Sequence, residues 1–293
     1  THSVTGKKLL LRVNCGSQMH LKHQIEYEAH ALKLIECSGR TPKVLYVDGS
    51  KKKLDHGVLV MEYLPGHAMD YHTELMLAAP CLADIHSVPV PESEEILIHP
   101  DNPLKAILEE CEEMFKVYLE SPLGDEEKKT YIRELLNLGW KREAEIRLES
   151  GYQCCINTEL NSTNFLINGE GKTNYLIDWE KPLFGNPAQD LGHFLAPTTT
   201  FWKTDVILTS EEIEKFIDAY IKAVGNRFKV DMIREHTHAF IPITCLRGIT
   251  WCAMAWVQYQ QPDKLIFNES TFKKLNAYLD MNFLKNIRTY LES

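Results

Sequence analysis

The chain has 293 residues, a formal net charge of −9 and a pI near 5.8. Hydrophobic residues make up 44% and charged residues 25%, values of an ordinary globular protein that exclude collagen, coiled coil and wholesale disorder. The acidic balance argues against a nucleic-acid binder, because a negative surface repels phosphate chains. At about 150 residues per domain, the length favours two domains or lobes.

The cysteines and the chain start indicate the cellular setting. Eight cysteines are too few for a disulfide scaffold and none has CxxC spacing, so we expect reduced, mostly buried thiols in a cytoplasmic protein. Residues 1–8 are polar and basic rather than a leader, and the missing initiator Met suggests the remainder of a longer protein. The most apolar window, 239–257, contains Pro242, Arg247 and Gly248, which favours a buried core helix over a membrane span.

The first part of the chain is rich in predicted strands. Apolar runs and helical spacing predict a strand over 9–13, a helix over 21–36, and strands over 42–47 and 57–61. Pro65-Gly66 then interrupts the pattern. We therefore expect a small, β-rich N-lobe over residues 1–64.

The remainder, residues 65–293, is expected to be a larger helical C-lobe. Periodic apolar residues predict helices over 75–85, 104–119, 126–149, 211–224, 231–256 with a bend at Pro242, and 269–291. Strands are predicted over 154–156, 165–167 and 174–177, and Thr198 to Trp202 is expected to be either a polar-aromatic loop or a helix-capping segment. The pattern predicts an α+β, two-lobed fold.

Three polar residues around the predicted hairpin fit phosphoryl transfer. Asn164 follows Glu159 by five positions, the acid-to-Asn spacing of kinase catalytic loops, and precedes Asp178 by 14. A hairpin of that length brings its two ends together. Glu159 would orient the substrate hydroxyl, while Asn164 and Asp178 would supply the oxygen ligands that Mg²⁺ prefers.

At these residues the chain resembles the aminoglycoside phosphotransferase and choline kinase family, which has a protein-kinase-like fold. The similarity extends to Leu82-Ala83-Asp84-Ile85-His86 and to Gly185-Asn186-Pro187-Ala188-Gln189-Asp190, where Asp190 would fix the catalytic loop. It implies that Arg12 touches the ATP phosphates and that Glu28 pairs with Arg12. The strand end at Met61, Glu62, Tyr63 and Leu64 would meet adenine.

Three departures from the family pattern leave the activity open. Asn157 and Glu159 stand where the family has His and Asp, and a carboxylate moved by about one C–C bond can cost on the order of 100-fold in rate. Arg12 replaces a more usual Lys. Only eight residues precede the first predicted strand, so the first strands of the N-lobe and the glycine-rich phosphate loop are not found in this stretch.

The resemblance implies an ATP- and Mg²⁺-dependent kinase of a small-molecule hydroxyl. An acidic run from Glu109 to Glu127 is either a solvated helix face or a wall that attracts a cationic substrate, such as an aminoglycoside or a choline-like alcohol. No nucleic-acid or membrane partner is expected. The alternatives are a pseudokinase-like nucleotide-binding protein and a metal-dependent hydrolase that uses Asp178 and Glu180. Glu180 could equally support a second metal or form plain hydrogen bonds.

Overall fold

The computed structural model describes residues 1–17, 19–91, 93–148, 151–261 and 268–292. The chain forms two compact units. Unit 1 comprises Thr1–His99, Gly151–Asp190 and Thr209–Asp231, and unit 2 comprises Pro100–Ser150, Leu191–Leu208 and Met232–Ser293. Because the chain passes repeatedly between them, each unit is assembled from segments that are distant in sequence. The lobe boundary expected near residues 61–66 stays a prediction.

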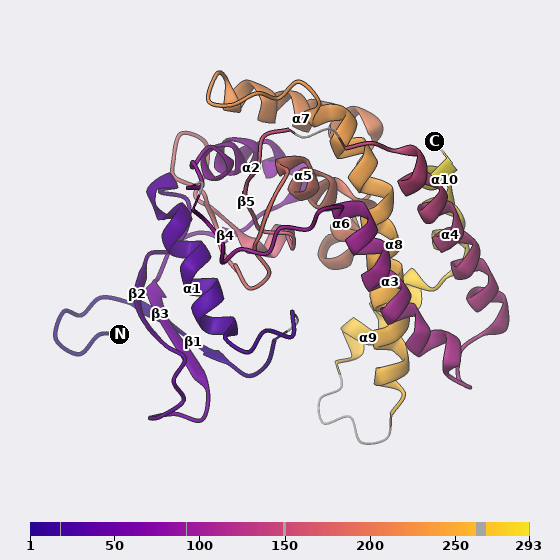
Figure 1. Ribbon diagram of the computed structural model, residues 1–293, viewed down its shortest axis with the longest axis horizontal. Helices are drawn as coiled ribbons and strands as arrows, with labels where there is room; N and C mark the ends of the chain where they lie inside the picture. Colours follow the sequence, from indigo (N-terminus) through magenta and orange to yellow (C-terminus); the bar gives the residue numbers. More distant parts are fainter. Residues whose placement is uncertain (18, 92, 149–150, 262–267, 293) are drawn as a thin grey trace. The chain divides into compact units, whose positions relative to one another are not determined.

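Unit 1 begins with a three-stranded antiparallel sheet in the order β1-β3-β2, against which helix α1 lies (Figure 1). The elements are β1 (Leu9–Asn14), α1 (Gln24–Ile35), a 3-10 turn η1 (Glu36–Ser38), β2 (Val44–Asp48) and β3 (Gly57–Glu62). The buried residues of α1 recur at helical spacing, and Ile25, Leu32 and Ile35 are almost fully buried. The four predicted elements of this region are confirmed with small shifts in their ends.

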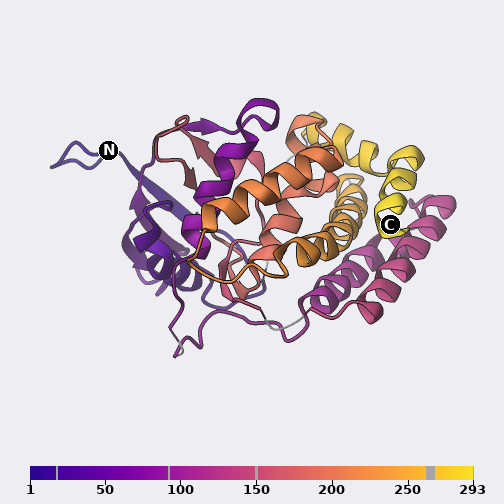
Figure 2. The same cartoon turned by 90° about the horizontal axis from the view of Figure 1, so that it is seen from above.

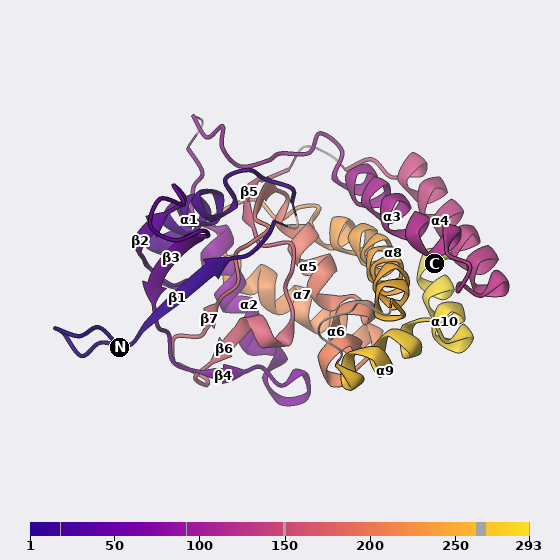
Figure 3. The ribbon, with the colours of Figure 1, turned by 90° about the horizontal axis from the view of Figure 1, so that it is seen from below.

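A second sheet of three short strands follows, in the order β4-β6-β7 (Figure 3). It consists of β4 (His67–Ala68), β6 (Phe165–Ile167) and β7 (Tyr175–Leu176), and helix α2 (Tyr71–His86) contacts it. Gly66 has a φ of 140°, and an added Cβ would lie 2.8 Å from the Leu166 Cβ and 3.1 Å from the Ile167 nitrogen. Only glycine therefore lets the chain approach β6 this closely.

The third sheet pairs β5 (Cys154–Ile156) with β8 (Leu183–Gly185). The 3-10 turn η2 (Ser162–Asn164) lies between β5 and β6, and helix α7 (Ser210–Val224) packs on α2. Helix α5 (Pro187–Leu195) follows β8 and contains the division between the two units. Because β5 and β8 are antiparallel, the segment that follows β5 lies beside the segment that precedes β8. Residues 157–164 are therefore positioned beside residues 178–182.

Unit 2 is built from helices. They are α3 (Pro103–Glu120), α4 (Glu126–Glu145), α6 (Pro197–Thr204), α8 (Ile233–Tyr259), α9 (Glu269–Tyr278) and α10 (Met281–Glu292). Helix α8 contacts α3 most extensively, and α3 and α4 run side by side in Figure 2. Glycine allows some of these approaches: an added Cβ on Gly248 would lie 2.6 Å from the Thr198 Cβ.

The structure differs from the expected secondary structure in several places. For Thr198 to Trp202 the loop alternative is wrong: the segment lies in the first turns of helix α6, because Pro197 starts the helix and Thr198, Thr199 and Thr200 are buried. The helix expected over 269–291 is two helices, separated at Leu279 and Asp280. The helix expected to reach Glu149 ends at Glu145, and Glu149 itself lies outside the described residues. The short strands β4 and β8 were not expected.

Helix α8 contains the apolar window singled out in the sequence. It is the one helix in the described part of the chain that is long and apolar enough to cross a membrane, and 72% of that window is buried inside the fold. A core helix has these properties, so the prediction of a buried helix agrees with the structure. The helix continues through Pro242 without interruption.

All eight cysteines are free thiols. Six are buried, whereas Cys15 and Cys37 are exposed. Burial strongly raises the pKa of the neighbouring thiols of Cys154 and Cys155, so both stay protonated and act as packing residues of β5.

Candidate active site around residues 157–182

The candidate catalytic loop, residues 157–164, begins where β5 ends, and Asp190 fixes its start. The backbone N–H groups of Asn157 and Thr158 donate to Asp190 Oδ2 and Oδ1 at 2.8 and 2.7 Å. Asp190 is fully buried, and Thr158 adopts a left-handed φ of 66° that is costly for a β-branched residue. The carboxylate thus compensates for a strained turn, in agreement with the expected role of Asp190.

A buried polar chain supports Asp190 from behind. His86 Nε2 lies 3.1 Å from Asp190 Oδ2, and His86 Nδ1 lies 2.8 Å from the hydroxyl of Tyr220. His86 and Tyr220 are both fully buried and come from α2 and α7. Because every buried polar group here has a partner, the network ties two helices to the loop.

Hydrogen bonds of Asn157 and Asn164 link the three residues that the sequence singled out. Asn157 Oδ1 accepts from the Glu159 N–H at 3.1 Å and Asn157 Nδ2 donates to the Asp178 carbonyl at 2.8 Å. Asn164 Nδ2 donates to the Glu159 carbonyl at 3.1 Å. The fold therefore brings Glu159, Asn164 and Asp178 together. Sequence reasoning did not find that Asn157 makes these contacts.

Arg12 on β1 meets three carboxylates at once. Its Nε lies 2.9 Å from Glu28 Oε2, Nη1 lies 3.2 Å from Asp178 Oδ1, and Nη2 lies 2.5 Å from Glu180 Oε2. The planar guanidinium directs its nitrogens in different directions, which a lysine ammonium cannot do in the same way. The expected Arg12–Glu28 pair is present, and the contacts with Asp178 and Glu180 are additional.

The surroundings of this cluster disfavour the ionised form of its carboxyl groups. Burial raises the pKa of Glu28 to about 7, although Arg12 opposes the shift. Burial also raises the pKa of Asp178 and of Glu180, and neighbouring carboxylates add to both shifts. Burial alone would lower the Arg12 pKa, but the three carboxylates outweigh it and the pKa is raised. An additional cation would be stabilised here.

The donor set fits a magnesium ion better than a softer metal. Among the described residues, no group of three or more His, Cys, Asp or Glu side chains is arranged to hold a metal. Asp178 and Asn164 offer instead one carboxylate and one amide, a sparse set of hard oxygen donors that suits an ion keeping waters and substrate phosphates as ligands. Asp178 has a left-handed φ of 65°, a conformation that Asp and Asn adopt more readily than other non-glycine residues.

Lys181 is a further charged group of this site that the sequence did not indicate. Its Nζ lies 3.6 Å from Glu159 Oε1, and its side chain is only 12% exposed. In the sequence, Lys181 is visible only as a lysine three positions after Asp178, and lysine is too common for this spacing to predict a role. The contact depends on two segments that only the β5–β8 pairing brings together.

The residues expected to meet adenine lie at the end of β3. Met61 is buried and pairs with Leu10 of β1, and the Glu62 N–H donates to the Lys43 carbonyl at 2.9 Å. Tyr63 is half exposed, with the Lys8 ammonium 5.5 Å from its ring centre. Leu64 follows in the connection to β4. Their contact with adenine stays a prediction.

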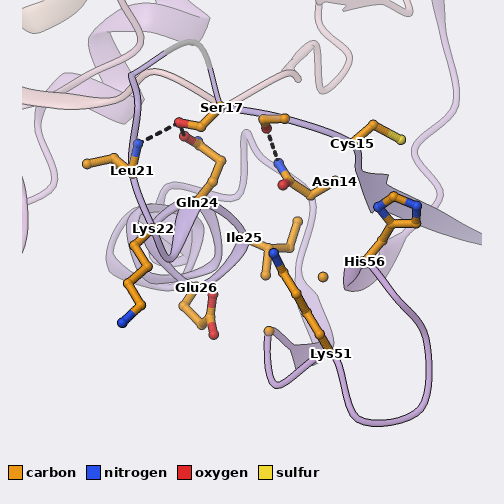
Figure 4. Close-up of a pocket in the computed structure, with 13 residues that line it drawn as sticks. Asn14, Cys15, Ser17, Leu21, Lys22, Gln24, Ile25, Glu26, Lys51 and His56 are labelled. Carbon is orange, nitrogen blue, oxygen red and sulfur yellow. Dashed lines mark hydrogen bonds between the residues drawn. The ribbon is translucent and has the colours of Figure 1, made fainter.

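A cavity of about 160 Å³ lies between the end of β1, the start of α1 and the β2–β3 turn (Figure 4). Its lining includes Lys22, Gln24, Lys51 and His56, but none of Glu159, Asn164 and Asp178. Gln24 connects the cavity with the candidate site, because its Nε2 donates to the Glu180 carbonyl at 2.6 Å. The cavity therefore lies beside the charged cluster rather than at it.

Part of the acidic run at 109–127 is already neutralised within unit 2. Glu110 pairs with Arg247 at 2.9 Å, and Glu112 pairs with Arg133 at 2.8 Å. Lys105 and Lys116 form helix-surface pairs with Glu109 and Glu120 at 3.8 Å. These contacts favour the interpretation as a solvated helix face, which was the plainer of the two alternatives.

Several solved structures with a similar fold are named as small-molecule kinases. A choline kinase from Streptococcus pneumoniae has a TM-score of 0.60 at 19% identity, covering 96% of this chain and 87% of its own. An ethanolamine kinase from Plasmodium vivax has a TM-score of 0.66 at 15% identity, covering 97% and 77%. A spectinomycin phosphotransferase, solved with ADP and spectinomycin, has a TM-score of 0.64 at 16% identity, covering 98% and 87%. The predicted protein-kinase-like α+β fold is thereby confirmed.

The family assignment rests on the sequence itself. No curated protein matches the chain, but residues 2–233 match the model of the phosphotransferase enzyme family. This match spans the ion cluster of Arg12, the candidate catalytic loop, Asp178 and Asp190. The chain belongs to the phosphotransferase enzyme family, as its motifs predicted.

Proposed function

We propose that the protein is an ATP-dependent kinase that phosphorylates a hydroxyl group of a small, amine-bearing molecule. The observation that carries this proposal is the convergence of Glu159, Asn164 and Asp178 through the hydrogen bonds of Asn157 to Glu159 and Asp178 and of Asn164 to Glu159. Phosphoryl transfer needs an acid that orients a hydroxyl and oxygen ligands for magnesium, in one place. A lobe of residues 1–64 and one of residues 65–293 would contribute to this site.

Each residue then has a defined role. Asn164 and Asp178 would hold Mg²⁺, which supplies neutralisation of the charge on the phosphates when bound. Arg12 would steady the phosphates, and Glu28 would hold Arg12 by the 2.9 Å ion pair. Met61, Glu62, Tyr63 and Leu64 would meet adenine. Glu159 would accept or orient the proton of the attacking hydroxyl.

The class of acceptor is supported by structural relatives and not by a motif. The three similar proteins are named for choline, ethanolamine and spectinomycin, each a nitrogen-containing cation at neutral pH that also carries a hydroxyl group. At 15–19% identity these likenesses show the fold alone, so the acceptor class is put to a direct test with a panel of acceptors.

The experiment is phosphoryl transfer from labelled ATP with Mg²⁺ to choline, ethanolamine and spectinomycin, with glycerol as an acceptor that lacks an amine. Asp178→Ala should lower turnover on the order of 1000-fold, because it removes several kcal/mol of charge stabilisation. Asp101→Ala, at an exposed position outside the site, is the matched control. Equal turnover in Asp178→Ala and wild type would refute the mechanism.

A nucleotide-binding protein without turnover is the second candidate. It is favoured by Asn157 and Glu159 in place of the usual His and Asp, and by the three carboxylates that Arg12 already contacts. Mg-ATP at 100 times its Kd should stabilise either protein by about 2.7 kcal/mol in thermal unfolding. Binding of that kind, with no product from any acceptor, would favour the second candidate.

A further inference from the structure

The segment from Asp178 to Pro182 is held on its backbone along most of its length. Four of its carbonyl groups accept hydrogen bonds from side chains of the candidate catalytic loop and of α1. The pairs are Asn157 Nδ2 with Asp178 O at 2.8 Å, Gln24 Nε2 with Glu180 O at 2.6 Å, Thr158 Oγ1 with Lys181 O at 2.7 Å, and Tyr27 Oη with Pro182 O at 2.7 Å. Lys181 therefore extends from a fixed backbone position.

Its side chain is directed at the candidate base. The ammonium lies 3.6 Å from Glu159 Oε1, and the two side chains are 12% and 24% exposed. A largely shielded ammonium is costly to bury without a counter-charge, so the attraction to Glu159 is stronger than in a surface pair. The Thr158 hydrogen bond to the Lys181 carbonyl also ties the two segments together on the other side of the same turn.

The length of Glu159 makes this contact meaningful. Where the family has Asp, Glu places its carboxylate farther from the loop by about one C–C bond, ~1.5 Å. Such a side chain has one more rotatable bond, so its carboxylate needs an external partner to remain in one orientation. Lys181 provides that partner from a backbone that four hydrogen bonds hold in place.

We propose that Lys181 is a positioning residue that holds the Glu159 carboxylate in the orientation required for phosphoryl transfer. The inference rests on the proposed kinase function and extends it to a residue outside the motifs. The acceptor oxygen forms a bond to the γ-phosphorus of ATP, and the bond from that phosphorus to the β,γ-bridging oxygen breaks. The electron pair leaves with ADP, and Glu159 receives the hydroxyl proton. Lys181 takes no part in the transfer itself.

The central experiment is steady-state kinetics of Lys181→Met with the best acceptor among choline, ethanolamine and spectinomycin. Methionine keeps the length and packing of the stem but removes the charge. We expect kcat to fall about 30-fold, because misplacing a catalytic group by about 1 Å can cost on the order of 100-fold. The KM for ATP and the Kd of Mg-ADP, measured by calorimetry, should change less than about 2-fold, because the nucleotide contacts are assigned to other residues.

Three further variants separate a positioning role from a structural one. Lys181→Arg keeps the charge and should recover kcat to within about 5-fold of wild type. Glu159→Gln should cost about 100-fold alone, and adding Lys181→Met to it should cost almost nothing more, because the residues act as a unit. Glu159→Asp restores the family residue but withdraws the carboxylate from Lys181, so kcat should fall about 10-fold. Lys141→Met, which removes an exposed lysine of α4, is the matched control.

The outcomes are distinct. The inference is wrong if the kcat of Lys181→Met equals that of wild type or if the kcat of Glu159→Asp exceeds it. It is also wrong if the fold-loss in kcat of the double variant is the product of the losses in Lys181→Met and Glu159→Gln. If circular dichroism shows that Lys181→Met does not fold, the kcat values of Lys181→Arg and Glu159→Asp decide whether the inference holds. If wild type transfers phosphate to no acceptor while it binds Mg-ADP, the proposed function fails and the role of Lys181 fails with it.

Discussion

The candidate catalytic loop of unit 1 and the α8 helix of unit 2 are both buried, but different forces define them. Around Asp190, buried polar groups are paired one by one: two backbone N–H groups and His86 surround a single carboxylate. Around α8, small side chains let helices approach, as where Gly248 faces Thr198. The first region is specified by donor and acceptor geometry and the second by volume, so changes of charge and changes of size should act on them separately.

The largest expected effect is a change of charge without a change of size in the loop. Asp190→Asn replaces one acceptor oxygen with an amide that faces a backbone N–H donor, at a site that is fully buried. We expect a loss of about 4 kcal/mol in the free energy of unfolding, measured by urea denaturation. Asp101→Asn is the exposed control, and equal stability of the two variants would contradict the assignment.

A pH dependence should occur only in the polar region. Burial raises the pKa of Glu28 to about 7 from its ordinary 4.5, so the folded protein binds this proton more tightly than the unfolded chain. Stability contributed by the bound proton is complete below about 4.5 and is lost as the pH rises through about 7, by up to about 3 kcal/mol.

Glu28→Gln removes this titration and tests the sign. The unfolding free energies of wild type and Glu28→Gln are measured in chelator without metal. From pH 5 to pH 8, the stability of wild type relative to Glu28→Gln should fall. A difference that is flat with pH, or that moves in the other direction, would show that Glu28 is ionised throughout. Arg12, Asp178 and Glu180 face Glu28 and are left unchanged in both proteins.

A change of size should affect the helical unit instead. Gly248→Ala adds a methyl group that would meet the Thr198 Cβ at 2.6 Å and its Oγ1 at 2.8 Å. Overpacking should cost about 2 kcal/mol, even though alanine is the better helix former. In thermal unfolding this variant should have a lower Tm with the same pH dependence as wild type, whereas a gain in Tm would show that α6 and α8 can separate freely.

The smallest expected effect comes from the far end of the polar chain. Tyr220→Phe removes the hydroxyl 2.8 Å from His86 Nδ1 and leaves the ring packing intact. The unfolding free energy should fall by about 1 kcal/mol, because one buried partner of His86 is lost. If turnover per folded molecule also falls more than about 3-fold, Tyr220 contributes to the orientation of the loop and not only to stability.

Local patterns in the sequence predicted much of the fold and the identity of most candidate residues. The apolar runs at β1, β5 and β6 and the helical spacing of α1 and α3 indicated the elements, because burial on one face imposes a period. The pairing of Arg12 with Glu28 followed from the family resemblance. What short-range patterns missed were β4 and β8, whose two and three residues are defined by the strands they pair with.

The sequence alone determined the family, the order of its motifs and the residue types available for chemistry, because these depend on neighbouring positions and fixed spacings. Only the tertiary structure decided that Asn157 connects Glu159 with Asp178, that Glu180 joins Glu28 on Arg12, and that Lys181 faces Glu159. These contacts depend on the pairing of β5 with β8 and on the approach of β1 to Asp178, 166 positions later in the chain. Packing across such distances follows from the whole fold and leaves no local periodicity.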